Sequence, residues 1–216
     1  MMLILNNEHF ASSLGKIVCV GRNYAEHALE LGNPITEQPL LFIKPATAAV
    51  SMTQPIDFPK HQGSCHYELE VAVLIGCQLT AASPQQAIAA IAGLGLGLDL
   101  TLRDVQSELK KNGHPWERAK SFDGACPLSS FIDPQGFDLA NLCFSLQRNG
   151  HLQQQGCTAD MLMAIPELLA EISNHFTLMP GDVVLTGTPV GVGPLASGDT
   201  LRLQLMDHLI IDTTVV

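Results

Sequence analysis

Two short runs of the chain alternate as β-strands do, and together they carry three carboxylates. In the first run, residues 66–73, Glu68 and Glu70 stand two positions apart, so both side chains should point to one face of a strand. In the second run, residues 93–99, glycines at alternate positions share a strand face with Asp99. A strand face without side chains allows another chemical group to approach the backbone closely. The pattern therefore predicts a sheet protein with an acidic site open to substrate.

The three acids also predict what the site holds. Converging carboxylates raise one another's pKa, whereas a hard divalent cation favours oxygen ligands and removes the repulsion. We therefore expect Glu68, Glu70 and Asp99 to bind Mg²⁺ or Mn²⁺. An isolated Glu-x-Glu on a strand is usually only a solvated face. The metal interpretation therefore needs support from other residues.

Length and composition restrict the class of protein. At 216 residues, with 46% hydrophobic and 15% charged residues, the chain can bury a sizeable core, and we expect one compact domain over 1–216. The net charge is −10 and the 11 Lys and Arg residues are scattered, which argues against a nucleic-acid partner.

The chain also shows no sign of a membrane or secreted protein. Residues 1–10 lack the basic and apolar pattern of a signal peptide, and no apolar segment has membrane-spanning length, so we expect a soluble cytoplasmic protein. The six cysteines show no C-x-x-C spacing and are expected to be reduced, mostly buried thiols.

Local patterns predict the elements that carry these residues. A Ser83-Pro84 start and a Thr101-x-x-Asp104 capping box predict two helices, and Asn149-Gly150 predicts a hairpin turn. The expected strands are 16–20, 40–43, 183–186 and 201–205, with a hairpin over 142–154. The expected helices are 24–31, 84–91, 101–111 and 163–174.

Several motifs occur in a specific order along the chain. They are Val20-Gly21-Arg22-Asn23-Tyr24 with His27 and Glu30, Phe42-Ile43-Lys44-Pro45, Tyr67-Glu68-Leu69-Glu70, Leu98-Asp99-Leu100-Thr101-x-Arg103-Asp104, Lys120-Ser121-Phe122-Asp123, and Thr186-Gly187-Thr188-Pro189-x-Gly191-Val192-Gly193. The set resembles the fumarylacetoacetate hydrolase superfamily from about residue 16 to the end. The short form is most similar to its acylpyruvase and oxaloacetate decarboxylase branch.

The resemblance implies an α+β fold, a mixed β-roll of stacked sheets with a few short helices, and a homodimer. It implies that Mg²⁺ or Mn²⁺ binds at the positions of Glu68, Glu70 and Asp99. It also implies a base at His27, paired with Glu30 on a short segment that orders over the substrate, and a cationic helper at Lys120.

The residues themselves suit these roles. His27 and Glu30 are three apart on the expected helix, and a carboxylate beside an imidazole raises its basicity and orients it. Such a pair on a surface helix is commonly just solvated, so the family context carries this interpretation. Gly21 and Gly32-Asn33 are plausible hinges for a lid. Lys120 would add positive charge where an oxyanion develops, although most lysines are simply exposed.

Four further residues are candidates for binding substrate. Arg103 and Gln106 lie on the first turns of the helix after Asp99 and could hold a substrate carboxylate, although a helix-surface role fits them equally. Thr188 lies in a turn whose backbone N–H groups could bind an anionic group. Arg22, in the first motif, is the fourth candidate. The glycines at 93, 95 and 97 do not form a dinucleotide fingerprint.

These parts support one leading function. We expect a metal-dependent hydrolase that cleaves a C–C bond of 2,4-dioxo acids, acylpyruvates such as fumarylpyruvate or acetylpyruvate, to pyruvate and a carboxylic acid. Decarboxylation of oxaloacetate passes through the same enolate. The alternative is an oxaloacetate tautomerase, or an isomerase or decarboxylase of an aromatic-catabolic oxo-diacid, on the same metal site. An inert cation-binding protein would not need His27, Glu30 and Lys120.

Overall fold

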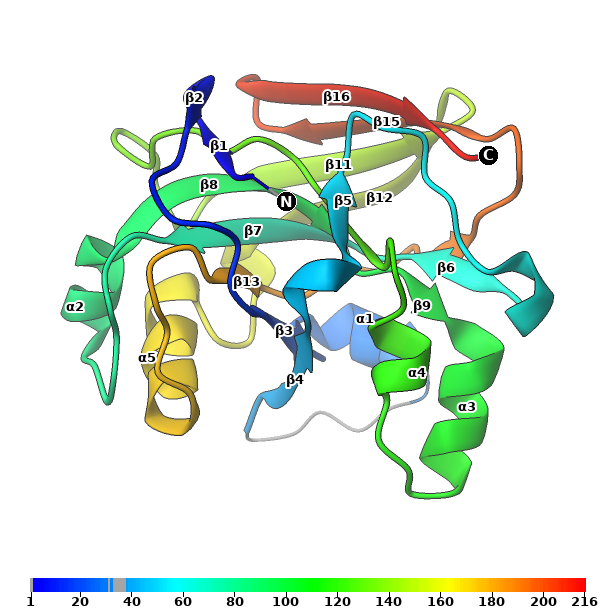
Figure 1. The fold of residues 1–216 in the computed structure, drawn as a ribbon, viewed down its shortest axis with the longest axis horizontal. Coiled ribbons are helices and arrows are strands. Elements are labelled where there is room, and N and C mark those ends of the chain that lie inside the picture. The colour runs from blue at the N-terminus through cyan, green and yellow to red at the C-terminus, as the bar shows by residue number, and fades with distance from the viewer. Residues whose placement is uncertain (1, 31, 33–37) are drawn as a thin grey trace.

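The computed structural model describes residues 2–30, 32 and 38–216. Its central feature is a mixed sheet of seven strands in the order β4-β3-β13-β7-β8-β10-β5 (Figure 1). These strands are β4 (Leu40–Lys44), β3 (Ile17–Gly21), β13 (Val183–Leu185), β7 (Leu69–Ile75), β8 (Ile91–Leu98), β10 (Cys126–Leu128) and β5 (Ala49–Ser51). The β3–β13 and β5–β10 pairs are parallel, and the others are antiparallel.

Smaller sheets accompany the central one. The four-stranded sheet, β12-β11-β15-β16, consists of β11 (Cys143–Arg148), β12 (His151–Cys157), β15 (Thr200–Leu205) and β16 (Leu209–Thr214). The others are β14-β6-β9, from β6 (Cys65–Tyr67), β9 (Thr101–Leu102) and β14 (Gly193–Pro194), and β1-β2, from β1 (Ile4–Leu5) and β2 (Glu8–His9).

Short helices surround the sheets. They are α1 (Ala25–Glu30), α2 (Pro84–Ala89), α3 (Arg103–Lys111), α4 (Glu117–Lys120) and α5 (Ile165–His175). In Figure 1 the four-stranded sheet lies above β7 and β8, with α2 and α5 at one end of the molecule and α3 and α4 at the other. This arrangement confirms the predicted α+β fold of stacked sheets.

The core lies between the stacked sheets. Val71 and Val73 of β7 and Leu94 and Leu96 of β8 pack in one buried cluster with Phe144 and other residues of the four-stranded sheet. The alternate residues of β7 face a second buried cluster. Strand β7 is therefore buried on both faces, which explains its nearly continuous apolar sequence.

The glycine face of β8 is not open to a ligand as was predicted, but packs against other parts of the protein. A Cβ built on Gly95 would lie 2.8 Å from Ser129 Oγ and 3.0 Å from the Phe131 ring, and one on Gly97 would lie 2.5 Å from the Leu185 side chain. The prediction of close approach is correct, but at these glycines the approaching group is the chain itself. The site lies only at the end of the strand, at Asp99.

Two predicted helix starts had different outcomes. The Ser83 hydroxyl accepts from Gln86 N and the Gln86 side chain accepts from Ser83 N, so α2 begins as predicted, although it ends before β8. The capping box at Thr101 is wrong. Thr101 belongs to β9, and its hydroxyl donates to Asp99 O and accepts from Lys120 Nζ.

The predicted hairpin turn is confirmed. Asn149 and Gly150 have φ of 53° and 76°, the left-handed values that a type I′ turn needs.

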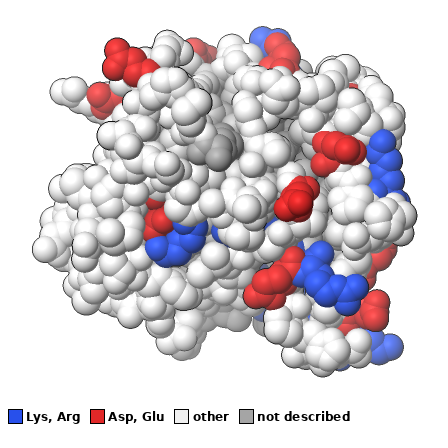
Figure 2. Space-filling view, in the orientation of Figure 1, with Lys and Arg blue, Asp and Glu red and all other residues white. Residues whose placement is uncertain are grey.

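On the face shown in Figure 2, acidic and basic side chains are scattered in small groups of mixed sign. Within the described ranges, no helix has the length and apolar character needed to cross a membrane.

Candidate active site

The three predicted carboxylates meet at one end of the central sheet. Glu68 lies between β6 and β7, Glu70 is in β7, and Asp99 directly follows β8. The pairing of β7 with β8 brings them together, because Glu70 lies opposite Gly97 and Asp99 N donates to Glu68 O at 2.9 Å. All three are buried, and one oxygen from each lies within 4.8 Å of those of the other two.

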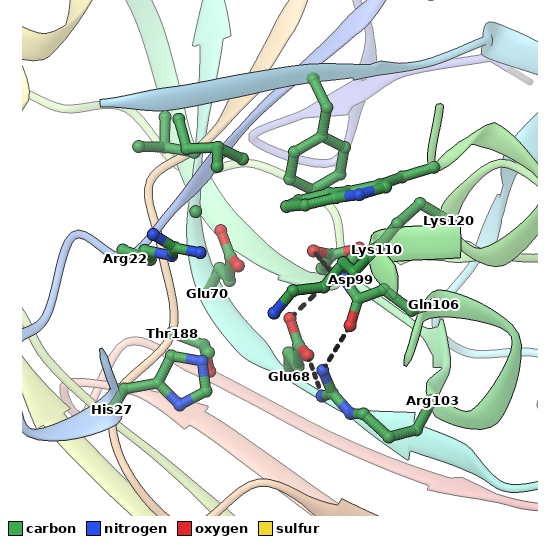
Figure 3. A pocket seen from close by; sticks show the side chains of 15 residues that line it. Arg22, His27, Glu68, Glu70, Asp99, Arg103, Gln106, Lys110, Lys120 and Thr188 are labelled. Atoms are coloured by element: carbon green, nitrogen blue, oxygen red, sulfur yellow. Dashed lines mark hydrogen bonds and ion pairs between the residues drawn. The ribbon is translucent and has the colours of Figure 1, made fainter. Parts of the chain in front are cut away.

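The ammonium group of Lys120 stands between two of these acids (Figure 3). Its Nζ lies 2.9 Å from Glu68 Oε2 and 2.6 Å from Asp99 Oδ2. Burial alone would raise the pKa of Glu68, but Lys120 and Arg103 outweigh it and hold that pKa well below its ordinary value. Burial likewise would lower the pKa of Lys120, yet Asp99 and Glu68 raise it. Glu68 and Lys120 are therefore both charged.

Glu70 has the opposite electrostatics. Burial and the neighbouring Asp99 raise its pKa well above the ordinary value for a glutamate, although Gly187 N–H donates to Oε2 at 2.6 Å. Without further positive charge, this carboxyl group therefore tends to keep its proton.

A second lysine supports Asp99 from behind. Lys44, at the end of β4, is fully buried, and its Nζ lies 2.8 Å from Asp99 Oδ1 and donates to the carbonyls of Leu100 and Ala125. Lys44 belongs to the Phe42-Ile43-Lys44-Pro45 motif, but its role was not predicted from the sequence. Strand alternation places Lys44 on the same face as Leu40 and Phe42, which line the site, and this pattern could have identified it.

The donor set fits a hard divalent cation. The Lys44–Asp99 contact is an ion pair without hydrogen-bond geometry, so Asp99 Oδ1 is buried with no hydrogen-bond donor. Asp99 Oδ1, which has an ion-pair partner but accepts no hydrogen bond, and the two neighbouring carboxylates together offer the oxygen ligands that Mg²⁺ and Mn²⁺ prefer.

We expect cation binding to release a proton from Glu70. A raised pKa means that the carboxyl must lose its proton before it can act as a ligand. Affinity for Mg²⁺ should therefore rise with pH, from the ordinary glutamate range up through the raised pKa. Calorimetric titration in two buffers of different ionisation enthalpy measures this proton, and identical apparent enthalpies in both buffers would contradict the assignment.

Removing the Lys44 charge should destabilise the fold. Lys44→Met leaves Asp99 with one fewer cation in a dry environment, and it leaves the carbonyls of Leu100, Lys120 and Ala125 without their donor. We therefore expect a loss of about 3–5 kcal/mol in the free energy of unfolding. Chemical denaturation measures this loss. The matched control is Lys16→Met, whose ion pair with Asp182 is partly exposed and should be worth at most about 1 kcal/mol. Equal losses in the two variants would remove the special role of Lys44.

A small cavity opens in front of the carboxylates. Its volume is about 50 Å³, far below the few hundred Å³ typical of drug-sized ligands. It is lined by all of the predicted site residues except Glu30, together with Val20, Gly21, Leu40, Phe42, Lys110 and Trp116. The cavity therefore suits a small, polar ligand.

Glu30 does not line the cavity itself, but it contacts His27, which does. His27 is buried, and its Nδ1 lies 3.2 Å from Glu30 Oε2 on helix α1. Glu30 Oε1 accepts from Gly191 N–H at 3.1 Å, which ties α1 to the turn after β13. The predicted pairing is therefore present, whereas Leu31 and Asn33, the expected helix end and hinge, lie outside the described residues.

Helix α3 supplies a positively charged wall. Arg103 pairs with Glu68 Oε1 and donates through Nη1 to Gln106 Oε1 at 2.8 Å. Lys110, which the sequence analysis did not select, lies on the same face as these two because the spacing is i, i+3, i+7. Burial, Arg22 and Arg103 all lower the pKa of Lys110, as expected in a cluster of cations. Such a wall attracts an anion.

The remaining predicted residues, Arg22 and Thr188, also line the cavity. Arg22 has φ of 64°, a left-handed conformation uncommon for a residue other than glycine. The Thr188 hydroxyl donates to Leu69 O at 2.8 Å. In its turn, the N–H groups of Gly187 and Gly191 bind Glu70 and Glu30, so these two N–H groups serve carboxylates of the protein rather than an anionic substrate.

Comparison with known proteins identifies the relatives of this chain. The family model described as fumarylacetoacetate (FAA) hydrolase C-terminal matches residues 16–216. The chain is 53% identical over 197 residues to the oxaloacetate tautomerase YcgM of Escherichia coli, covering 90% of each chain. It is 42% identical over 187 residues to the human mitochondrial oxaloacetate tautomerase FAHD1, covering 86% of this chain and 85% of that protein.

A solved structure adds a relative with a bound ligand. The fumarylpyruvate hydrolase of Pseudomonas aeruginosa, in complex with Mn²⁺ and pyruvate, superimposes with a TM-score of 0.93 at 32% identity, covering 100% of this chain and 95% of that one. With the family match, these similarities show that the chain belongs to the fumarylacetoacetate hydrolase family.

Proposed function

We propose that the protein is an oxaloacetate tautomerase, which interconverts the keto and enol forms of oxaloacetate. The observation that carries this proposal is the 53% identity, over 90% of both chains, to a tautomerase. The small cavity supports it, because a four-carbon dianion needs little space and much positive charge. The tautomerase alternative of the sequence analysis thus has better support than its leading hydrolase interpretation.

We further propose that Glu68, Glu70 and Asp99 hold Mg²⁺ or Mn²⁺. When bound, the cation would supply positive charge for the carboxylate and 2-oxo oxygens of the substrate. The Mn²⁺ and pyruvate in the Pseudomonas aeruginosa relative support this choice, as does the close approach of the three buried carboxylates.

His27 would act as the base. Tautomerisation moves a proton between C3 and the 2-oxo oxygen of oxaloacetate, so a group must accept the C3 proton and later return it. The Glu30 carboxylate occupies Nδ1 of His27, which leaves Nε2 for the substrate and stabilises the imidazolium that forms. This division of the two ring nitrogens is what a positioned base requires.

Lys120 would stabilise the charge that this proton transfer creates. Its raised pKa keeps the side chain a cation, so it can hold the developing enolate oxygen by charge. Arg22 and Lys110 would bring positive charge to the distal carboxylate of the substrate. Arg103, Gln106 and Thr188 form other parts of the cavity lining. Each part of a dianionic substrate would thus meet a cation.

A hydrolase remains the second candidate, for one specific reason. A His–Glu pair can also activate water, and the Pseudomonas aeruginosa relative is named a fumarylpyruvate hydrolase. Acylpyruvate cleavage and oxaloacetate decarboxylation pass through an enolate that Lys120 would stabilise equally. The same holds for decarboxylation of an aromatic-catabolic oxo-diacid.

The test of the proposal follows the enol form of oxaloacetate by its ultraviolet absorbance. Purified protein supplied with Mg²⁺ or Mn²⁺ should accelerate the approach to keto–enol equilibrium from either side, without consuming oxaloacetate. If the protein leaves the rate of equilibration unchanged under these conditions, the proposal fails.

A further inference from the structure

Two cysteines face each other on neighbouring strands, away from the carboxylate site. Cys143 of β11 is the direct partner of Cys157 of β12, and their Sγ atoms lie 2.8 Å apart. They are 14 residues apart in sequence, so no local spacing motif reveals the pair.

The strand geometry at this position suits a disulfide. Thr158 N donates to Leu142 O, which makes that pair the hydrogen-bonded one and places Cys143 and Cys157 at the next, non-hydrogen-bonded position. The Cα atoms of such pairs are about 4.5 Å apart, within the range of about 4.4–6.8 Å that disulfides span. A bond between the two sulfurs therefore needs no change of strand register.

The pair is also accessible, and one sulfur affects the protonation of the other. Cys143 is exposed and Cys157 is half-buried, whereas Cys19, Cys65 and Cys126 are buried in the core. The neighbouring Cys157 sulfur raises the pKa of Cys143 to about 11. Because the two sulfurs are in direct contact, oxidation of either one leaves the other in position to react with it second.

We propose that Cys143 and Cys157 are a site of reversible oxidation that forms an intramolecular disulfide with hydrogen peroxide as oxidant. The thiolate of one of the two cysteines attacks one peroxide oxygen, the O–O bond breaks, and a sulfenic acid and hydroxide form. The thiol of the other cysteine then attacks the sulfenic sulfur, the S–O bond breaks, and the S–S bond forms with release of water. In total, two thiols lose two electrons and two protons, and one peroxide is reduced to two waters.

The position of the pair gives this oxidation a connection to the cavity. The chain that leaves Cys157 reaches Met161, which forms a β-bridge with Tyr24 at the base of helix α1. Tyr24 also packs edge-on against Phe144, with ring centroids 6.4 Å apart. The disulfide would therefore form beside the anchor of the segment that carries His27. The proposal does not depend on the proposed tautomerase activity.

The experiment counts thiols in the reduced full-length protein before and after treatment with peroxide. Denaturing thiol titration should give six thiols before treatment and four after it, and peptide mapping should link Cys143 to Cys157 within one chain. Dithiothreitol should restore six. Loss of no thiol, a bridge between two chains, or oxidation mainly at the exposed Cys77 would overturn the proposal.

Single variants test the two-step mechanism. In Cys143→Ser and in Cys157→Ser the reaction should stop at the sulfenic acid of the remaining cysteine, which dimedone traps as a thioether. Cys77→Ser is the matched control and should form the disulfide at the wild-type rate. A bridge that still forms within one chain in either single variant, or absence of the dimedone label from both single variants, would contradict the proposal.

Discussion

Glu70→Gln should remove measurable Mg²⁺ and Mn²⁺ binding and lower tautomerase turnover on the order of 10³-fold. The expected size reflects the several kcal/mol by which a bound cation stabilises developing negative charge. Glutamine keeps the shape of the side chain and an oxygen that can accept from Gly187 N–H, so the turn after β13 should be preserved. Calorimetry measures the binding, and the enol assay measures the turnover.

Glu70 is a better target than Glu68 for this test. Glu68 also pairs with Lys120 and Arg103, so its replacement would disturb three charged groups at once. Glu70 has a raised pKa in the metal-free protein, and its neutral substitute should therefore leave folding nearly unchanged. Glu117→Gln, an exposed change on helix α4, is the control and should retain binding and turnover. Wild-type cation affinity in Glu70→Gln would show that the carboxylates do not form the cation site.

His27→Ala should lower turnover by roughly 10²–10⁴-fold, the usual effect of losing a general base. Cation affinity should survive, because no proposed ligand is changed. Glu30→Gln should have a smaller effect, since it removes the charge that orients His27 but not the base itself. Turnover as a function of pH, measured together with Mg²⁺ affinity, separates loss of the base from loss of the cation site.

The chain contains a natural control for this pair. His175 Nε2 lies 3.1 Å from Glu171 Oε1 on helix α5, but this pair is exposed and lines no part of the cavity. His175→Ala should therefore keep wild-type turnover. If His27→Ala retained wild-type turnover as well, His27 would be no more than another solvated helix residue, and the base would have to be sought elsewhere.

The parts of the site that depend on local sequence were predictable. The spacing of Glu68 and Glu70, the i, i+3 pairing of His27 with Glu30, and the left-handed turn at Asn149 are properties of a few neighbouring residues. The family motifs added Lys120 as a cationic residue of the site, whereas its ion pairs with Glu68 and Asp99 came only from the structure. The stacked-sheet fold followed from the same resemblance, because the motifs occur in a specific order.

The parts that depend on distant contacts were not predictable. Gly95 looks like an opening for ligand until Ser129 and Phe131 fold over it, and Thr101 looks like a helix cap until Lys120 binds its hydroxyl. Lys44 looks like the polar end of a strand, although the acid it supports is 55 positions further along the chain. Such roles are set by strand pairing, which brings residues of large sequence separation together.

The most direct test of the proposed function compares two substrates on one preparation of the wild-type protein. With the same Mg²⁺- or Mn²⁺-loaded sample, kcat/KM is measured for enol–keto conversion of oxaloacetate and for cleavage of acetylpyruvate and fumarylpyruvate. Tautomerisation should be favoured by at least about 10²-fold. Arg22 and Lys110 offer positive charge to the second carboxylate of oxaloacetate, where acetylpyruvate has only an uncharged methyl group, and the wall of Phe42 and Trp116 leaves little room for the longer acyl group of fumarylpyruvate. Rapid release of pyruvate from either acylpyruvate, with no acceleration of the oxaloacetate equilibrium, would contradict the tautomerase and establish the hydrolase in its place.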